Sequence, residues 1–185
     1  MYVMYLLMRQ IINTYIQKLK DERFVVGLVY IDNYEEALDS TDDVRRSLLA
    51  GLIDKRVNKY FSPGSAIVRK LEKDKYIVVF RYNFLEKLMQ DRFSLLEEIK
   101  SIKIGNEMTL TLSMGIGTGS AEYSKNYDVA KAAMDLALGR GGDQAVVKDG
   151  EKILYYGGKS QQMEKNTRVK VRVKAHALRQ ILDNN

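Results

Sequence analysis

Residues 24–31 read Phe-Val-Val-Gly-Leu-Val-Tyr-Ile. This nearly continuous apolar run indicates a strand buried on both faces near the centre of a sheet. Before it, residues 11–19 carry apolar side chains at helical spacing. After it, Asp42 and Asp43 can cap a helix that continues to Phe61 with its apolar side chains on one face.

Two strand-like runs follow, residues 66–71 and 76–80, separated by the charged tetrad Glu72-Lys73-Asp74-Lys75. This arrangement is typical of a hairpin with a charged tip, which we expect beside the end of the 24–31 strand. The remaining pattern predicts a helix over 84–99, a strand over 108–116, a helix over 127–138 and a hairpin of strands 145–148 and 153–156. The sequence therefore predicts an α+β domain, with a central, mainly antiparallel sheet of about five strands and helices on both faces.

The composition sets limits on the chemistry. The chain has 185 residues, of which 45% are hydrophobic and 29% charged, which is enough for one ordinary globular domain with a real core. No apolar stretch reaches the roughly 18 to 20 residues of a spanning helix. Cysteine is absent and His176 is the one histidine, so disulfides, a thiolate nucleophile and a Cys-based zinc site are excluded. Chemistry would have to come from carboxylates, hydroxyls, lysines or a bound nucleotide.

The net charge of +6 is concentrated near the end of the chain. Residues 164–185 contain six Lys and Arg against two acids, a net of +4, and the rest carries +2. This segment lacks interleaved aromatic residues, so we expect a solvated helix or linker and no nucleic-acid partner. Apolar residues recurring every four positions from Val169 to Ile181 favour a helix, although alternation with cations also permits a strand.

The order of these segments, together with Leu112-Ser113-Met114-Gly115-Ile116-Gly117, resembles the GGDEF domain of diguanylate cyclases over roughly residues 22–156. A narrower resemblance is to the modified GGDEF domain of membrane-bound cyclic di-AMP phosphodiesterases. It is carried by residues 30–34 (Tyr-Ile-Asp-Asn-Tyr), 139–144 (Gly-Arg-Gly-Gly-Asp-Gln), 156–160 and 167–178. The resemblance implies a GGDEF, or nucleotidyl-cyclase-like, fold.

In that family two membrane helices, a PAS domain, a degenerate GGDEF domain and a DHH–DHHA1 catalytic module lie in one chain. The resemblance therefore implies a connector helix from a PAS domain over residues 1–21, a degenerate GGDEF domain over 22–158, and a linker with the start of the DHH domain over 159–185. It also implies the cytoplasmic part of a membrane-anchored bacterial protein. Its partners would be the adjacent PAS and DHH–DHHA1 domains and, in the parent protein, a second copy in a homodimer.

Diguanylate cyclases need two carboxylates to hold two Mg²⁺ ions against the triphosphate. By the resemblance, the first metal ligand falls on Tyr30, and only the second acid is kept, as Asp32. In the signature hairpin Asp74 is kept, but Lys75 stands where a carboxylate would face magnesium, and Glu72 and Lys73 replace two glycines. We therefore expect that this domain is not a diguanylate cyclase, and we assign no catalytic residue.

Other positions of the cyclase pocket depart as well. The guanine-reading positions fall on Leu38 and Ser47, and the phosphate-binding positions on Leu138 and Gly142. The product-inhibition pair falls on Pro63 and Ala66. Losing these groups together removes the cyclase mechanism.

Eight residues remain candidates for weak nucleotide binding: Asp32, Asn33, Lys73, Asp74, Lys75, Arg140, Gly141 and Gly142. Asp32 and Asp74 can together bind one Mg²⁺ that accompanies a nucleotide. Alternatively, Asp32 caps the strand end and Asp74 pairs with Lys73 or Lys75. The glycines of residues 139–142 can cradle a phosphate, but a helix C-cap followed by a turn is the commoner meaning of such glycines.

Two functional classes stay open at this point. The first is a regulatory module, requiring no cofactor, that relays to or stabilises a phosphodiesterase by binding a nucleotide or by homodimerising. The second is a residual enzyme, a slow Mg²⁺-dependent hydrolase of ATP that uses Asp32 and Asp74.

Overall fold

The computed structural model describes residues 2–39, 42–104 and 108–158. The segment 159–185 lies outside the described residues, and with it the predicted linker, the DHH lead-in, the predicted helix and His176.

The centre of the domain is a six-stranded sheet with strand order β2-β3-β1-β4-β5-β6. The strands are β1 (Phe24–Ile31), β2 (Ile67–Lys70), β3 (Lys75–Arg81), β4 (Leu112–Thr118), β5 (Gln144–Asp149) and β6 (Lys152–Gly157). Only the β4–β5 pair is parallel, so the predicted α+β class is confirmed, with six strands rather than about five.

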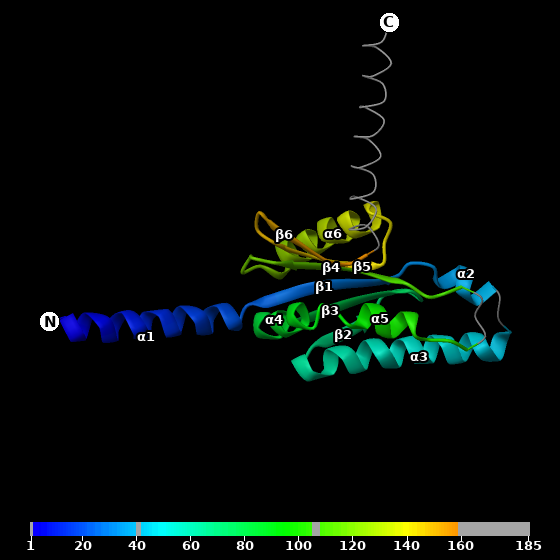
Figure 1. Ribbon diagram of the computed structural model, residues 1–185, viewed down its shortest axis with the longest axis horizontal. Coiled ribbons are helices and arrows are strands. Elements are labelled where there is room, and N and C mark those ends of the chain that lie inside the picture. The colour runs from blue at the N-terminus through cyan, green and yellow to red at the C-terminus, as the bar shows by residue number, and fades with distance from the viewer. Residues whose placement is uncertain (1, 40–41, 105–107, 159–185) are drawn as a thin grey trace, which may run out of the picture.

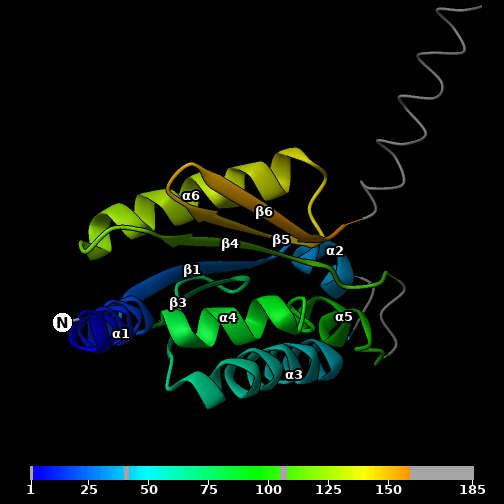
Figure 2. The same ribbon diagram turned by 60° about the vertical axis from the view of Figure 1, so that its left-hand side comes forward.

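Helices cover both faces of this sheet, as expected (Figure 2). They are α1 (Tyr2–Asp21), α2 (Tyr34–Asp39), α3 (Asp43–Phe61), α4 (Tyr82–Gln90), α5 (Leu95–Lys100) and α6 (Tyr123–Gly139), with a short 3-10 turn η1 (Ser62–Gly64). One face carries α3, α4 and α5, and the other carries α6, while α1 projects away from the body of the domain (Figure 1).

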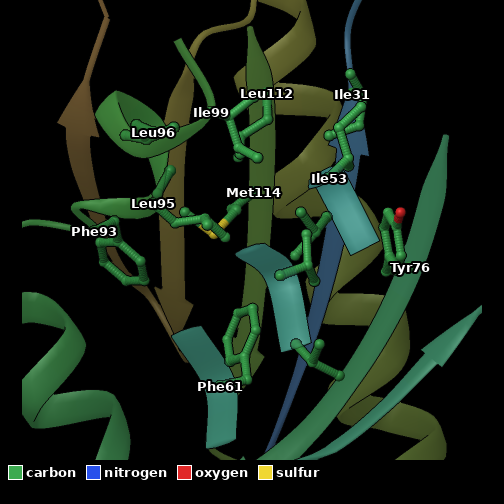
Figure 3. Packing of buried hydrophobic residues seen from close by; sticks show 14 of the residues in the cluster. Ile31, Ile53, Phe61, Tyr76, Phe93, Leu95, Leu96, Ile99, Leu112 and Met114 are labelled. Carbon is green, nitrogen blue, oxygen red and sulfur yellow. The ribbon is translucent and has the colours of Figure 1, made fainter. Parts of the chain in front are cut away.

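The two central strands are buried on both faces. β1 pairs with β3 on one side and β4 on the other, and every residue of β4 is buried. Leu112, Met114 and Ile116 of β4 join the main core beneath α3 and α5 (Figure 3). The alternate positions of β4, Gly115 and Gly117, lie directly against the backbone of α6.

The predicted capping of α3 is confirmed. The Asp42 side chain accepts a hydrogen bond of 2.8 Å from the Arg45 backbone N–H, which satisfies one of the free donors at the helix start. The helix ends at Phe61, where residues 62–64 form the 3-10 turn. Its buried side chains are Leu49, Ile53, Val57 and Phe61.

The prediction of a single helix over 84–99 is wrong. The chain forms α4 and α5, and Arg92 and Phe93 between them adopt left-handed φ angles of 55° and 56°. The Asp91 carboxylate accepts hydrogen bonds from the Ser94 hydroxyl at 2.6 Å and from Tyr60 at 3.2 Å. Local side-chain bonds of this kind compete with helix continuation, while the apolar spacing on either side gives no sign of the break.

Three further boundaries differ from the sequence prediction. β4 begins at Leu112 rather than 108, because residues 109–111 bond to the segment after β1 instead of continuing the ladder. α6 begins a turn earlier, at Tyr123, and the buried Asn126 anchors this turn by donating to the Phe24 carbonyl at 3.1 Å. The six-residue α2 was not predicted, since one and a half turns show no clear periodicity.

Candidate functional site

The candidate residues gather where the end of β1, the β2–β3 hairpin and the turn before β5 meet. Tyr30 lies opposite Lys75 in the β1–β3 ladder, and the Ile31 N–H donates to the Asp74 carbonyl at 2.9 Å. The hairpin tip therefore lies beside the end of β1, as the sequence predicted. Asp32 and Asp74 belong to neighbouring backbone segments, so the two acids lie on the same side of the domain.

Asp32 connects the end of β1 to the turn before β5. Its carboxylate Oδ2 accepts a hydrogen bond of 3.0 Å from the Asp143 backbone N–H, and its own N–H donates to the Thr111 carbonyl at 3.0 Å. Gly142 approaches closely enough that an added Cβ would lie 2.9 Å from Oδ2. This contact is similar to the alternative in which Asp32 is a capping residue and not a metal ligand. The difference is that Asp32 caps the turn before β5 rather than the end of its own strand.

Asn33 makes two hydrogen bonds to the chain before β4. Its amide Nδ2 donates to the Thr109 carbonyl at 2.8 Å, and its Oδ1 accepts from the Thr111 N–H at 3.0 Å. Both ends of the side chain are thus engaged by backbone, and the residue fixes where β4 begins.

The hairpin tip is held by a different ion pair from the predicted one. Lys75 pairs with Glu72 at 2.7 Å rather than with Asp74, and this hydrogen bond raises the pKa of Lys75. The Lys75 ammonium also lies 5.6 Å from the centre of the Tyr30 ring. Lys73 is exposed and Asp74 is half-buried in the loop between β2 and β3, where the Asp74 backbone carbonyl accepts a hydrogen bond from β1.

The glycine segment after α6 closes the helix. The Gly141 N–H donates to the Leu138 carbonyl at 2.9 Å and the Gly142 N–H to the Ala137 carbonyl at 3.0 Å. Both glycines have positive φ angles, 98° and 72°, as in a helix C-cap. The Arg140 guanidinium lies 4.3 Å from the centre of the Tyr155 ring. The two amides that would cradle a phosphate are therefore used within the helix end.

A feature that sequence reasoning missed lies next to Asp32. Lys100 at the end of α5 pairs with Asp143 at 2.8 Å, and both side chains border a cavity of about 280 Å³ with Arg92, Tyr155 and Gly157. Burial lowers the pKa of Lys100, but hydrogen bonds to Asp143 and Glu97 outweigh it, so the net shift is upward. The two residues are far apart in sequence, and no local pattern indicates their pairing.

The described residues contain neither a cluster of metal ligands nor a helix that could span a membrane. Residues 2–39, 42–104 and 108–158 hold no group of three or more His, Asp or Glu side chains placed to bind a metal ion. In the same residues, no helix has the length and apolar character needed to cross a membrane.

Beside the hairpin, the buried phenol of Tyr76 donates a hydrogen bond to Asp54, which also pairs with Lys70 at 2.8 Å. Burial, followed by this contact with Asp54, raises the pKa of Tyr76 well above its ordinary value. The unfolded phenol ionises near pH ~10, while the folded one keeps its proton. This contribution to stability is therefore complete below about pH 10 and decreases as the pH rises further.

We expect Tyr76→Phe to reduce the free energy of unfolding by about 1–2 kcal/mol at neutral pH. We also expect stability above about pH 10 to decline less steeply than in the wild type, by up to about 1.4 kcal/mol per pH unit. Urea unfolding at neutral and alkaline pH measures both quantities. Tyr15→Phe, on the exposed part of α1, is the matched control and should change neither. An unchanged alkaline slope in Tyr76→Phe would show that the folded phenol ionises normally.

The fold defines the class of protein. The structure is similar to the active GGEEF domain of a diguanylate cyclase from Vibrio cholerae, with a TM-score of 0.57 and 12% identity over 71% of this chain and 86% of that one. It is also similar to the GGDEF domain of DgcB from Caulobacter crescentus, with a TM-score of 0.53 and 13% identity over 66% and 75% of the two chains. At such identities the likeness establishes a GGDEF-like fold.

Sequence similarity is more specific. The family described as "Cyclic-di-AMP phosphodiesterase GdpP-like, GGDEF domain" matches residues 29–154, and this chain belongs to it. Relatives named cyclic-di-AMP phosphodiesterase GdpP are 36% identical over 87% of this chain in Geobacillus thermodenitrificans and 34% identical over 90% in Bacillus subtilis. The chain spans 25% and 26% of the length of these two relatives.

Proposed function

We propose that this chain is the regulatory GGDEF domain of a bacterial cyclic di-AMP phosphodiesterase, and that it has lost diguanylate cyclase chemistry. The family and the names of its relatives support the parent activity. The observation that carries the loss of cyclase chemistry is the pairing of Tyr30 with Lys75 across the end of β1 and the hairpin.

A cyclase of this fold needs two carboxylates to hold magnesium at this place. Here a lysine ammonium, paired with Glu72, lies beside a half-buried tyrosine. Burial raises the pKa of Tyr30, so its phenol remains neutral at physiological pH and is a poor ligand for magnesium. The Lys75 ammonium next to the site also repels Mg²⁺. A triphosphate bound here would therefore lack the two metal ions that a cyclase uses to neutralise it.

Base and phosphate recognition are also missing at the positions that the GGDEF resemblance indicates. Leu38 is buried in the core, and the Ser47 hydroxyl donates to the Asp43 carbonyl in its own helix at 3.2 Å. Leu138 carries no charge, and the Gly142 amide is used at the end of α6. Nucleotide binding at this site is therefore weak and unselective.

We expect the purified chain to prefer GTP over ATP by less than about tenfold, or about 1.4 kcal/mol, and to form no cyclic di-GMP. Strong discrimination requires buried polar groups that go unpaired with the wrong base, and Leu38 cannot supply them. Calorimetric titration with each nucleotide at one magnesium concentration measures the ratio, and chromatography of the mixture detects product. A larger preference for GTP, or any cyclic di-GMP, would restore the cyclase interpretation.

The placement of the two ends supports a relay role. β6 runs in the same direction as β1. Because α1 leads into the start of β1, β6 finishes at the opposite end of the strands from α1 (Figure 2). Between these ends, Tyr82 at the start of α4 contacts Lys20 and Arg23, each 5.0 Å from its ring centre. Phe93, beyond the end of α4, packs against Tyr156 of β6 at 5.0 Å. A preceding PAS domain and a following DHH–DHHA1 module would thus be joined through α4, in the cytoplasmic part of a membrane-anchored protein and without a required cofactor.

A second candidate function is slow Mg²⁺-dependent hydrolysis of ATP. It is favoured by the Ile31–Asp74 backbone hydrogen bond of 2.9 Å, which brings Asp32 and Asp74 into neighbouring segments. Phosphate release from ATP with and without Mg²⁺ tests it. Loss of turnover in Asp74→Ala, but not in Glu151→Ala in the exposed β5–β6 turn, would favour the hydrolase. Binding without turnover would favour the regulatory module.

A further inference from the structure

A polar cavity lies between α5, the turn before β5 and the end of β6, and its volume is about 280 Å³. Its lining includes two cationic side chains, Arg92 and Lys100, and two carboxylates, Glu97 and Asp143. We call it the Lys100 cavity. Within the described part of the chain, none of the eight candidate nucleotide-binding residues borders it. The Lys100 cavity is therefore a separate place from the candidate site.

The backbone around the Lys100 cavity is held in unusual conformations. Arg92 and Asp143 each have a left-handed φ angle of 55°, which residues other than glycine rarely adopt. Gly157 and Gly158 also border the cavity, and their φ angles are 75° and 79°. Strained backbone of this kind gathers at ligand-binding sites, where the surrounding structure holds it in place. Its presence in three segments around one cavity therefore indicates a binding site.

The Lys100 ammonium is held by two carboxylates that differ in exposure. Its Nζ lies 2.8 Å from Asp143 Oδ2 and 2.8 Å from Glu97 Oε1. The Asp143 side chain is 15% exposed, whereas the Glu97 side chain is 76% exposed. Because an ion pair with so exposed a carboxylate is weak, Glu97 can rotate into solvent and leave the ammonium to another anion. The mostly buried Asp143 stays and orients the ammonium.

Arg92 supplies a second cation. Its side chain is exposed, and among residues 2–39, 42–104 and 108–158 it forms no ion pair. A guanidinium can donate two parallel N–H bonds to a phosphate, and an ammonium adds a compact positive charge. Once Glu97 has moved away, the charges of Arg92 and Lys100 face Asp143 alone, a net of +1. The cavity then favours an anion.

We propose that the Lys100 cavity binds the phosphate group of a small molecule, with Arg92 and Lys100 as its donors, and that this group takes the place of Glu97 on the Lys100 ammonium. A phosphate has three oxygen atoms that accept strong hydrogen bonds, enough for both cations at once. The volume of about 280 Å³ is just below the usual range of small-molecule pockets, about 300–1,000 Å³. This inference does not depend on the proposed function.

Titration of the 185-residue chain, followed by amide NMR in a chloride buffer, tests the site. The probes are inorganic phosphate, AMP and acetate. Inorganic phosphate should shift the amide signals of Arg92, Lys100 and Gly158 and should saturate them at millimolar concentrations. Equal affinity for AMP would mean that the phosphate group alone is recognised. Tighter binding of AMP at the same amides would mean that the source is a phosphorylated molecule whose remainder also contacts the cavity.

Two substitutions of exposed residues should change the phosphate affinity in opposite directions. Arg92→Gln should weaken it by at least about tenfold, because a charge-assisted hydrogen bond is lost. Glu97→Gln should strengthen it by about two- to fivefold, because a weak competing ion pair is removed. The matched controls are Arg69→Gln on the exposed edge strand β2 and Glu151→Gln in the exposed β5–β6 turn, and neither should change the affinity.

Four results would overturn the proposal. They are the absence of saturable shifts with phosphate or AMP, acetate binding as tightly as phosphate, an unchanged affinity in Arg92→Gln, and an affinity in Glu97→Gln that is unchanged or weaker. AMP that shifts Tyr30 and Asn33 but leaves Arg92 unmoved would also overturn it, because the nucleotide would then occupy the candidate site. That last result would leave the proposed function intact, so the two can fail independently.

Discussion

Gly117→Ala is expected to reduce the free energy of unfolding by at least about 3 kcal/mol. Gly117 lies in the fully buried strand β4, and an added Cβ would stand 2.2 Å from the Asn126 carbonyl oxygen and 2.4 Å from the Ala130 nitrogen. Both are backbone atoms of α6, so a side-chain rotation cannot relieve the overlap. The helix would have to move away from the sheet, and the packing of its buried alanines would be lost.

Urea unfolding followed by circular dichroism measures this loss. The matched control is Gly51→Ala in the middle of α3, where an added Cβ meets nothing within 4 Å. Since alanine favours helix over glycine, the control should be more stable than wild type by about 0.5–1 kcal/mol. Replacing glycine by alanine is thus expected to lower the free energy of unfolding at Gly117 and to raise it at Gly51. Wild-type stability of Gly117→Ala would mean that β4 and α6 are farther apart than described.

Phe93→Ala is expected to cost about 3–5 kcal/mol, the usual range for a fully buried phenylalanine. The ring is 0% exposed and packs against Tyr156 of β6. The backbone of residue 93 is left-handed, with a φ of 56°. Phe93→Gly should therefore be more stable than Phe93→Ala by about 1 kcal/mol, because glycine adopts this conformation without steric cost.

The same unfolding experiment, applied to both variants, separates loss of packing from relief of backbone strain. Phe24→Ala, whose ring is 39% exposed, serves as the control and should lose less than half as much stability as Phe93→Ala. If Phe93→Gly were the less stable of the two position-93 variants, the residue would have an ordinary helical or extended backbone. The break between α4 and α5 would then be placed wrongly.

The elements whose signals are local could be predicted from the sequence alone. Each of three such signals depends on a few neighbouring residues: the apolar run of β1, the Asp42 cap of α3 and the charged tip of the β2–β3 hairpin. The family could also be inferred from the sequence, because motifs such as residues 30–34 and 112–117 survive as short contiguous strings.

Features that depend on partners distant in sequence could be seen only in the folded domain. Lys100 at the end of α5 pairs with Asp143 before β5, although the two residues are far apart in sequence. Asp32 caps the turn at Asp143, and Asn33 fixes the start of β4, through hydrogen bonds spanning 111 and up to 78 residues. The helix break at Phe93 is stabilised by burial against Tyr156 of β6. Local periodicity carries no information on such contacts, because their free energy arises only once distant segments have been brought together.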